Sequence, residues 1–165
     1  GKPIRSVVAT HHHFDHSGGL RAAAAEDLTI VSHESNQAYF AEAYAAPRTL
    51  GADRLSKSGK AAKFQPVGDK LVLGDGARTL ELHHVKGAPH VHGMLIGYLP
   101  KEKILLVADL YSPRVPITKT PEKINPNTAS LWSNIVDLKL DIDTILPIHG
   151  RMAKVAELKM EAGAN

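Results

Sequence analysis

Four side chains near the start of the sequence have the types and the spacing that bind a pair of metal ions. His11, His13, Asp15 and His16 form the pattern HxHxDH directly after the β-branched run at residues 4–10. Side chains two apart on an extended chain share a face, so the first two histidines can chelate one cation. Once the chain has turned, the aspartate and the third histidine can reach a second cation. A chain of this composition would contain the pattern by chance roughly 0.002 times, so we interpret it as a binuclear metal site.

A zinc ion takes four ligands, so the pattern leaves each cation short of donors that the rest of the chain must supply. Three candidates lie in a loop or at the end of a predicted strand: His90, Asp109 and His149. His92 competes with His90 for the loop position. An aspartate after a strand is also common as a cap or loop residue, which leaves an alternative for Asp109. A structural role is favoured for the other four histidines, which are His12, His33, His83 and His84.

The motifs and their order resemble those of the metallo-β-lactamase superfamily. That family has HxHxDH, then a loop histidine, then an aspartate at a strand end, and then a histidine in a Pro-x-His-Gly setting, which is found here at residues 147–150. The resemblance covers nearly the whole chain and favours His90 over His92, because the interval from His90 to Tyr98 matches the loop-then-strand pattern of the family. It implies two sets of ligands: His11, His13 and His90 on the first metal, and Asp15, His16 and His149 on the second, with Asp109 bridging.

The hydrophobic pattern predicts alternating strands and helices, and hence an α/β fold. The predicted strands are residues 4–10, 28–31, 70–73, 78–83, 94–99, 103–107 and 144–148. The predicted helices are residues 20–25, 33–45, 127–140 and 152–161, with Ser17 or Asp15 capping the first and Ser32 the second. The four strands between residues 70 and 107 indicate a meander. Together with the resemblance, this order predicts the αβ/βα sandwich of the metallo-β-lactamase fold.

Length and composition predict a single domain over residues 1–165, because 43% of the residues are apolar and 22% charged, as in globular proteins. The chain has no cysteine, which excludes disulfides and thiolate ligands. A net charge of +3 is too small to argue for nucleic acid. The basic stretch at residues 48–63 is predicted to be a mobile loop; a solvated surface segment is favoured over a lid that attracts an anionic substrate. No segment is apolar enough to span a membrane, so we expect a soluble protein, cytoplasmic or periplasmic, without a membrane partner.

The metal motif begins at residue 11, whereas domains of the family begin with several strands before it. We therefore expect a fold that lacks its amino-terminal strands, and either the chain is a trimmed form or a second copy of it covers the exposed sheet edge. The missing strands normally shape the substrate groove. A metal-binding domain with little or no turnover is therefore an alternative to an active enzyme.

The expected function is that of a metal-dependent hydrolase with a small-molecule substrate. Two divalent ions lower the pKa of a water between them and polarise the substrate, so that hydroxide attacks. The predicted catalytic residues are Asp15, which can orient the hydroxide, and the bridging Asp109. Zinc is favoured, although iron and manganese also accept these nitrogen and oxygen ligands.

The resemblance also bears on the substrate. With an aspartate at position 109, the chain resembles the thioesterase, lactonase and phosphodiesterase branches more than the true zinc β-lactamases. Cleavage of an ester, thioester, lactone or amide-like bond is therefore favoured over β-lactam hydrolysis. His13, in place of a glutamate, counts against the di-iron electron-transfer branch. A phosphodiesterase that uses the basic residues 48–63 is a weaker alternative. For Tyr111, packing in the core is favoured over donation to a substrate oxygen.

Overall fold

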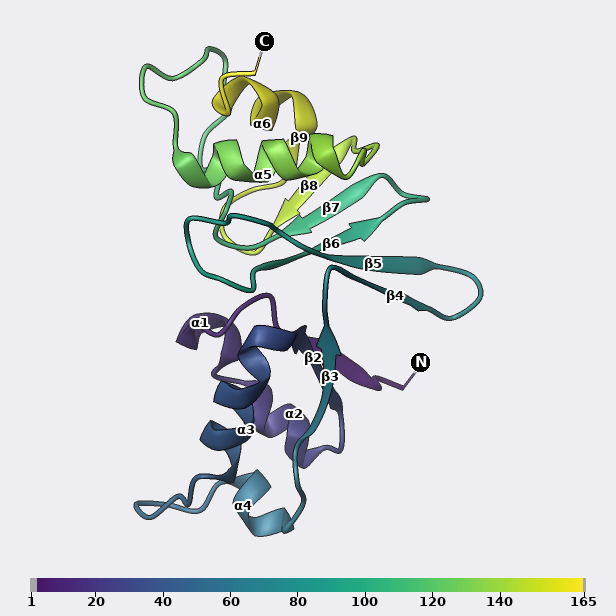
Figure 1. The fold of residues 1–165 in the computed structure, drawn as a ribbon, viewed down its shortest axis with the longest axis vertical. Helices are drawn as coiled ribbons and strands as arrows, with labels where there is room; N and C mark the ends of the chain where they lie inside the picture. The colour runs from purple at the N-terminus through teal and green to yellow at the C-terminus, as the bar shows by residue number, and fades with distance from the viewer. Residues whose placement is uncertain (1–2, 165) are drawn as a thin grey trace. The chain divides into compact units, whose positions relative to one another are not determined.

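The structure, a computed structural model, describes residues 3–164 (Figure 1). The chain divides into two compact units, and the boundary in sequence lies between Gly68 and Asp69. Each unit has its own sheet and its own core, so each is described by itself. The single domain predicted over residues 1–165 stays a prediction.

The first unit is built on a parallel sheet with the order β1-β2-β3. Its strands are β1 (Ser6–Val8), β2 (Thr29–His33) and β3 (Lys63–Val67). Parallel strands need long crossover connections, and helices supply them here. Between β1 and β2 lie α1 (Phe14–Ser17) and α2 (Leu20–Ala25). Between β2 and β3 lie the 3₁₀ turn η1 (Glu34–Asn36), α3 (Gln37–Ala45) and α4 (Arg54–Ser58).

The core of this unit joins three of its helices to the central strand. Ile30 of β2 is fully buried and belongs to one apolar cluster with Leu20 of α2, Phe40 of α3 and Leu55 of α4. Strand β2 is almost continuously buried, which is typical of an inner strand of a parallel sheet. This packing holds the end of β1, where the HxHxDH pattern follows, against a rigid neighbour.

The predicted caps in the first unit are wrong. The hydroxyl of Ser17 donates to the carbonyl of His12, 3.0 Å away, and does not cap a helix. The helix after β2 begins with η1, where the ring of His33 accepts a hydrogen bond from the backbone N–H of Ser35. Ser32 instead accepts a hydrogen bond from the side chain of Gln37 at 2.7 Å. A histidine ring thus takes the place of the expected hydroxyl cap.

The structure also corrects the loop predicted at residues 48–63, which contains helix α4. The carboxylate of Asp53 accepts a hydrogen bond from the backbone N–H of Ser56 at 2.9 Å and so caps this helix, and Gly59 ends it in the left-handed conformation. The buried guanidinium of Arg21 holds the same carboxylate, with Nη2 3.1 Å from Oδ1. A tertiary ion pair therefore orders a segment that has little periodicity of its own.

The Arg21–Asp53 pair predicts a pH dependence of stability. The Arg21 guanidinium, helped by the backbone N–H of Ser56, holds the pKa of the Asp53 carboxyl well below its usual range. Because the pKa is lowered in the folded state, the stabilisation is present above the ordinary aspartate pKa of about 4 and is lost as the pH falls toward the lowered value. We expect Asp53→Asn to lower the unfolding midpoint at pH 7 and to flatten its decline between about pH 4 and 2. Chemical unfolding across this pH range measures the midpoint, with Asp137→Asn as the control at an exposed aspartate. If the unfolding midpoints of Asp53→Asn and wild type changed equally with pH, the prediction would be contradicted.

The second unit is built on a six-stranded sheet with the order β4-β5-β6-β7-β8-β9. Its strands are β4 (Lys70–Gly74), β5 (Thr79–His84), β6 (Leu95–Leu99), β7 (Ile104–Val107), β8 (Thr144–Pro147) and β9 (Ala153–Lys154). Strands β4 to β7 form the predicted antiparallel meander, and β8 adds parallel to β7. Two helices complete the unit: α5 (Pro126–Asp137) and α6 (Val155–Glu161).

Both helices of the second unit contribute to one apolar core with the sheet. Leu131 and Ile135 of α5 are buried in this core, whereas Leu138 lies beyond the end of the helix and is partly exposed. The last helix begins later than predicted, because residues 153 and 154 pair with β8 as strand β9. Leu158 of α6 is fully buried and anchors the helix. Within the described part of the chain, no helix has the length and apolar character needed to cross a membrane.

Candidate metal centre

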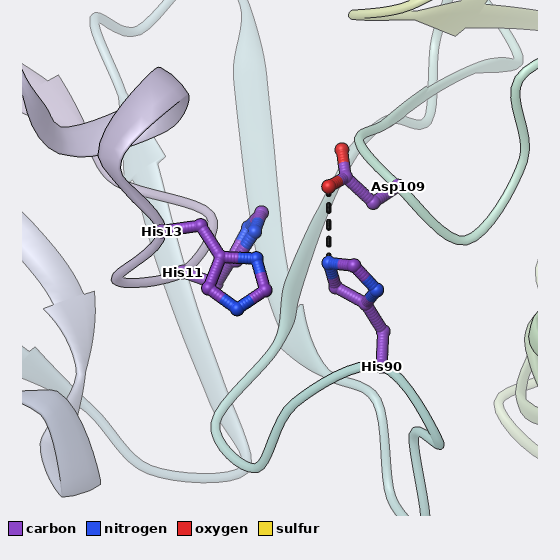
Figure 2. A group of neighbouring side chains, drawn as sticks. All are labelled: His11, His13, His90 and Asp109. Atoms are coloured by element: carbon purple, nitrogen blue, oxygen red, sulfur yellow. Dashed lines mark ion pairs between the residues drawn. The ribbon is translucent and has the colours of Figure 1, made fainter.

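The four residues of the HxHxDH pattern, which we call the first half-site, lie in the turn after β1 and in helix α1. The ring centroids of His11 and His13 are 4.6 Å apart and those of His11 and His16 are 4.3 Å apart. Figure 2 shows the first of these pairs. The structure therefore brings these three imidazoles together within the first unit.

The way in which His11 and His13 meet differs from the strand geometry that the sequence suggested. Strand β1 ends at Val8, and residues 10–12 form a bend. The carbonyl of His13 then accepts hydrogen bonds from the backbone N–H groups of His16 and Ser17, at 3.1 and 2.9 Å, which forms the turn of α1. This turn returns His16 to the ring of His11, and Nε2 of His16 lies 3.2 Å from Oδ2 of Asp15.

The second half-site consists of His90, Asp109 and His149, all in the second unit. Asp109 follows β7 and His149 follows β8, and these strands are parallel neighbours with Val107 opposite Pro147. Their carboxyl ends therefore meet at one edge of the sheet. The backbone N–H of Ile148 donates to the carbonyl of Val107 at 2.8 Å, which extends the pairing toward both donors.

The Asp109 carboxylate faces two different imidazoles. Its Oδ2 lies 3.0 Å from Nε2 of His90, the contact drawn as a dashed line in Figure 2, and its Oδ1 lies 3.4 Å from Nε2 of His149. The sequence offered two histidines, His90 and His92, for the ligand in the loop before β6. The ring of His90 is the one that reaches Asp109, whereas the ring of His92 lies edge-to-face against His84 with centroids 5.9 Å apart.

The chemistry of these side chains suits a divalent cation. The residues that could hold one are four from the first unit and three from the second: His11, His13, Asp15, His16, His90, Asp109 and His149. Imidazole nitrogens and carboxylate oxygens are ligands for zinc, iron and manganese. A carboxylate whose two oxygens are directed at separate imidazoles has the arrangement required to donate one oxygen to each of two cations. The assignment of each residue to a particular metal stays a prediction.

Two other residues have the structural roles that the sequence favoured. His83 is buried, and its Nε2 pairs with Oε2 of Glu81 at 2.9 Å on strand β5. Tyr111 is buried in the core of the second unit. Burial, together with the negative charges of Glu161 and Glu157, raises the pKa of the Tyr111 phenol to about 12. Tyr111 is thus a core residue.

Two residues that no sequence pattern indicated, Arg151 and Glu157, form an ion pair beside the second half-site. The pair joins the loop after His149 to helix α6. Neither residue belongs to a motif, and a charged pair six residues apart across a strand and a helix has no periodic signal.

Comparisons with known proteins agree on the fold. The family model described as the metallo-beta-lactamase superfamily matches residues 1–149. A search of curated proteins returns no match. Among solved structures, a metallo-beta-lactamase from Pontibacter korlensis is 17% identical with a TM-score of 0.68, over 99% of this chain and 69% of its own. Rubredoxin oxygen:oxidoreductase from Desulfovibrio gigas is 16% identical with a TM-score of 0.69, over 97% of this chain and 43% of its own.

A third structure, the flavodiiron protein from Giardia intestinalis, is 18% identical with a TM-score of 0.65, over 97% of this chain and 41% of its own. The chain thus spans from about two fifths to about seven tenths of the length of these three proteins. At these identities the likeness establishes the fold, and it confirms the predicted α/β class of metallo-β-lactamase type.

Proposed function

This chain belongs to the metallo-β-lactamase superfamily, and we propose that it is a metal-dependent hydrolase whose two half-sites together hold two divalent cations. The observation that carries the proposal is the Asp109 carboxylate, which directs one oxygen at His90 and the other at His149. The cluster of three imidazoles in the first half-site supports it from the other unit. Zinc is the proposed metal, since it accepts the imidazole and carboxylate ligands of this set, which iron and manganese accept as well.

The proposed ligand sets follow from the half-sites. We assign His11, His13 and His90 to one cation and Asp15, His16 and His149 to the other, with Asp109 shared. Such a pair of cations, when bound, would supply hydroxide at neutral pH and polarise the bond to be cleaved. Each cation would thus draw ligands from both units, which makes an intact centre dependent on both.

The chain's own residues perform the remaining tasks. We propose that Asp15, which lies at the start of α1 beside His16, orients the attacking hydroxide as well as binding a cation. Asp109 is held at the end of β7 by the β7–β8 pairing, so its carboxylate is preorganised and does not need to be ordered during the reaction. The proposed substrates are esters, thioesters, lactones or amide-like compounds.

Other activities of the superfamily are less well supported. The structural neighbours include metallo-β-lactamases and an oxygen:oxidoreductase, and at 20% identity or less they share the fold with this chain. The imidazole of His13 lies in the ring cluster of the first half-site, at a position where the di-iron electron-transfer branch has a glutamate, and this counts against that branch. Hydrolysis therefore remains the proposal, and β-lactams and phosphodiesters belong in the substrate panel.

Metal analysis combined with a substrate screen tests this function. We expect elemental analysis of the zinc-loaded protein to give two ions per chain, and we expect the loaded protein to hydrolyse at least one ester, thioester or lactone. A His11→Ala, His149→Ala double variant should retain at most one ion and lose the turnover. Two ions without any turnover would favour a metal-binding domain, and equal metal contents in the two proteins would overturn the proposed centre.

A further inference from the structure

Two loops that follow the candidate ligands of the second half-site are joined to each other. The backbone N–H of Arg151 donates to the carbonyl of Pro113 at 2.9 Å. Gly150 has a φ of +98°, and a Cβ placed on it would lie 2.4 Å from that same carbonyl oxygen. The loop after His149 therefore lies directly on the loop after Asp109.

Glu157 of α6 binds both loops. Its Oε2 accepts a hydrogen bond from the backbone N–H of Ile117 at 3.1 Å, in the segment that follows Asp109. Its two oxygens also accept from the guanidinium of Arg151, with Nη1 3.2 Å from Oε1 and Nη2 on Oε2. A further bond from the backbone N–H of Lys154, at 3.3 Å, fixes the carboxylate at the start of the helix.

The Glu157 carboxyl group is held in its ionised form. The Arg151 guanidinium, with the backbone N–H groups of Ile117 and Lys154, lowers the pKa of this carboxyl to about 2. Its side chain is 20% exposed and that of Arg151 is 31% exposed, so the pair is partly shielded from water. A charged, two-pronged contact of this kind is stronger and more directional than a neutral hydrogen bond.

We propose that Glu157 is a positioning residue that orients His149, through Arg151 and the loop that carries both, for the binding of the second cation. This proposal rests on the proposed function, because it assigns His149 to the second cation. Glu157 also caps α6 through the backbone N–H of Lys154, but the fully buried Leu158 anchors this helix in the core of the second unit. Loss of the carboxylate should therefore loosen the two loops while the core stays folded.

Cobalt titrations followed by visible absorption test the proposal on the whole chain. For Glu157→Gln we expect one of the two binding steps to weaken by about 10- to 100-fold, the range found for residues that orient metal ligands. The other step should stay within about threefold of the wild type, because His11, His13 and His90 lie outside these two loops and the shared Asp109 is held at the end of β7 by the pairing with β8. Arg151→Lys, which keeps the charge but loses the two-pronged contact, should weaken the same step by a smaller factor.

The matched control is Asp143→Asn, which makes the same carboxylate-to-amide change in an exposed ion pair with Lys154, next to α6. It should leave both steps unchanged. Equal weakening of both steps in Glu157→Gln, or equal effects of the two variants, would overturn the positioning role.

A measurement without metal separates this proposal from the proposed function. In the metal-free protein, hydrogen exchange at the amides of Ile117 and Arg151 should be about tenfold faster in Glu157→Gln than in wild type, with the core of the second unit unchanged. If the wild type binds no metal pair while both amides respond, the proposed function fails and the link between the loops stands. If the Arg151 amide keeps its protection in the variant, the link itself is wrong.

Discussion

Replacing Asp109 by alanine is expected to have the largest effect on the metal centre. The variant should bind at least one metal ion fewer per chain than the wild type, and its turnover should fall by about 10²- to 10³-fold or more, as expected when a preorganised electrostatic contact is lost from an active site. The reason is that one carboxylate directs its two oxygens at His90 and His149, so a single substitution removes a proposed ligand from both cations. Elemental analysis and steady-state kinetics measure the two effects.

The control for this prediction is a pair of histidine variants in the same loop. His90→Ala should lower metal content as Asp109→Ala does, because its ring pairs with the Asp109 carboxylate. His92→Ala should leave the metal content unchanged, because its ring packs against His84. If His92→Ala lost metal and His90→Ala did not, the loop ligand would be misassigned.

Gly150→Ala is expected to have the largest effect on stability of any single methyl group added near the second half-site. The position has a φ of +98°, which L-residues rarely adopt, and the new Cβ would lie 2.4 Å from the carbonyl oxygen of Pro113. The strain and the clash with backbone together should cost about 3 kcal/mol, and thermal unfolding should occur roughly 6–12 °C lower than in wild type. The relaxed loop should also displace the neighbouring His149, so the metal content should fall.

Alanine substitutions at two other glycines separate the cost of the backbone strain from the cost of the clash with Pro113. Gly87 has a φ of +67° and open space where an added methyl group would lie, so Gly87→Ala tests the backbone strain alone and should cost about 1 kcal/mol. Gly51 has open space and no positive φ, so Gly51→Ala should be nearly neutral. A midpoint for Gly150→Ala within about 2 °C of that for Gly87→Ala would show that the contact with Pro113 is not tight.

Much of the candidate site could be predicted from the sequence, because its candidate ligands are marked by short patterns of neighbouring residues. The HxHxDH spacing keeps its donors within one turn, and the backbone hydrogen bonds from His16 and Ser17 to His13 close that turn. Asp109 and His149 each follow a run of mostly apolar residues, which identifies two strands. Strand ends alone could not show that these strands are parallel neighbours, which is what brings the two donors to one edge.

The features that were missed depend on contacts distant in sequence. Strand β3 begins at Lys63 and contains Pro66, so its sequence lacks a clear apolar run. The segment is a strand because it pairs with β2. Helix α4 exists because Arg21 holds its cap, Asp53, from 32 residues away. Hydrophobic periodicity reports which face of an element is buried, and it contains no signal for such ion pairs.

Anomalous diffraction from zinc-loaded crystals tests whether ligands from both units hold one pair of cations. We expect two zinc peaks about 3.5 to 4 Å apart, with an oxygen of Asp109 about 2.0–2.2 Å from each. One zinc should also contact His11 and His90, and the other His16 and His149. Zinc ions held by the residues of one unit alone, or peaks far from Asp109, would show that the proposed centre does not exist.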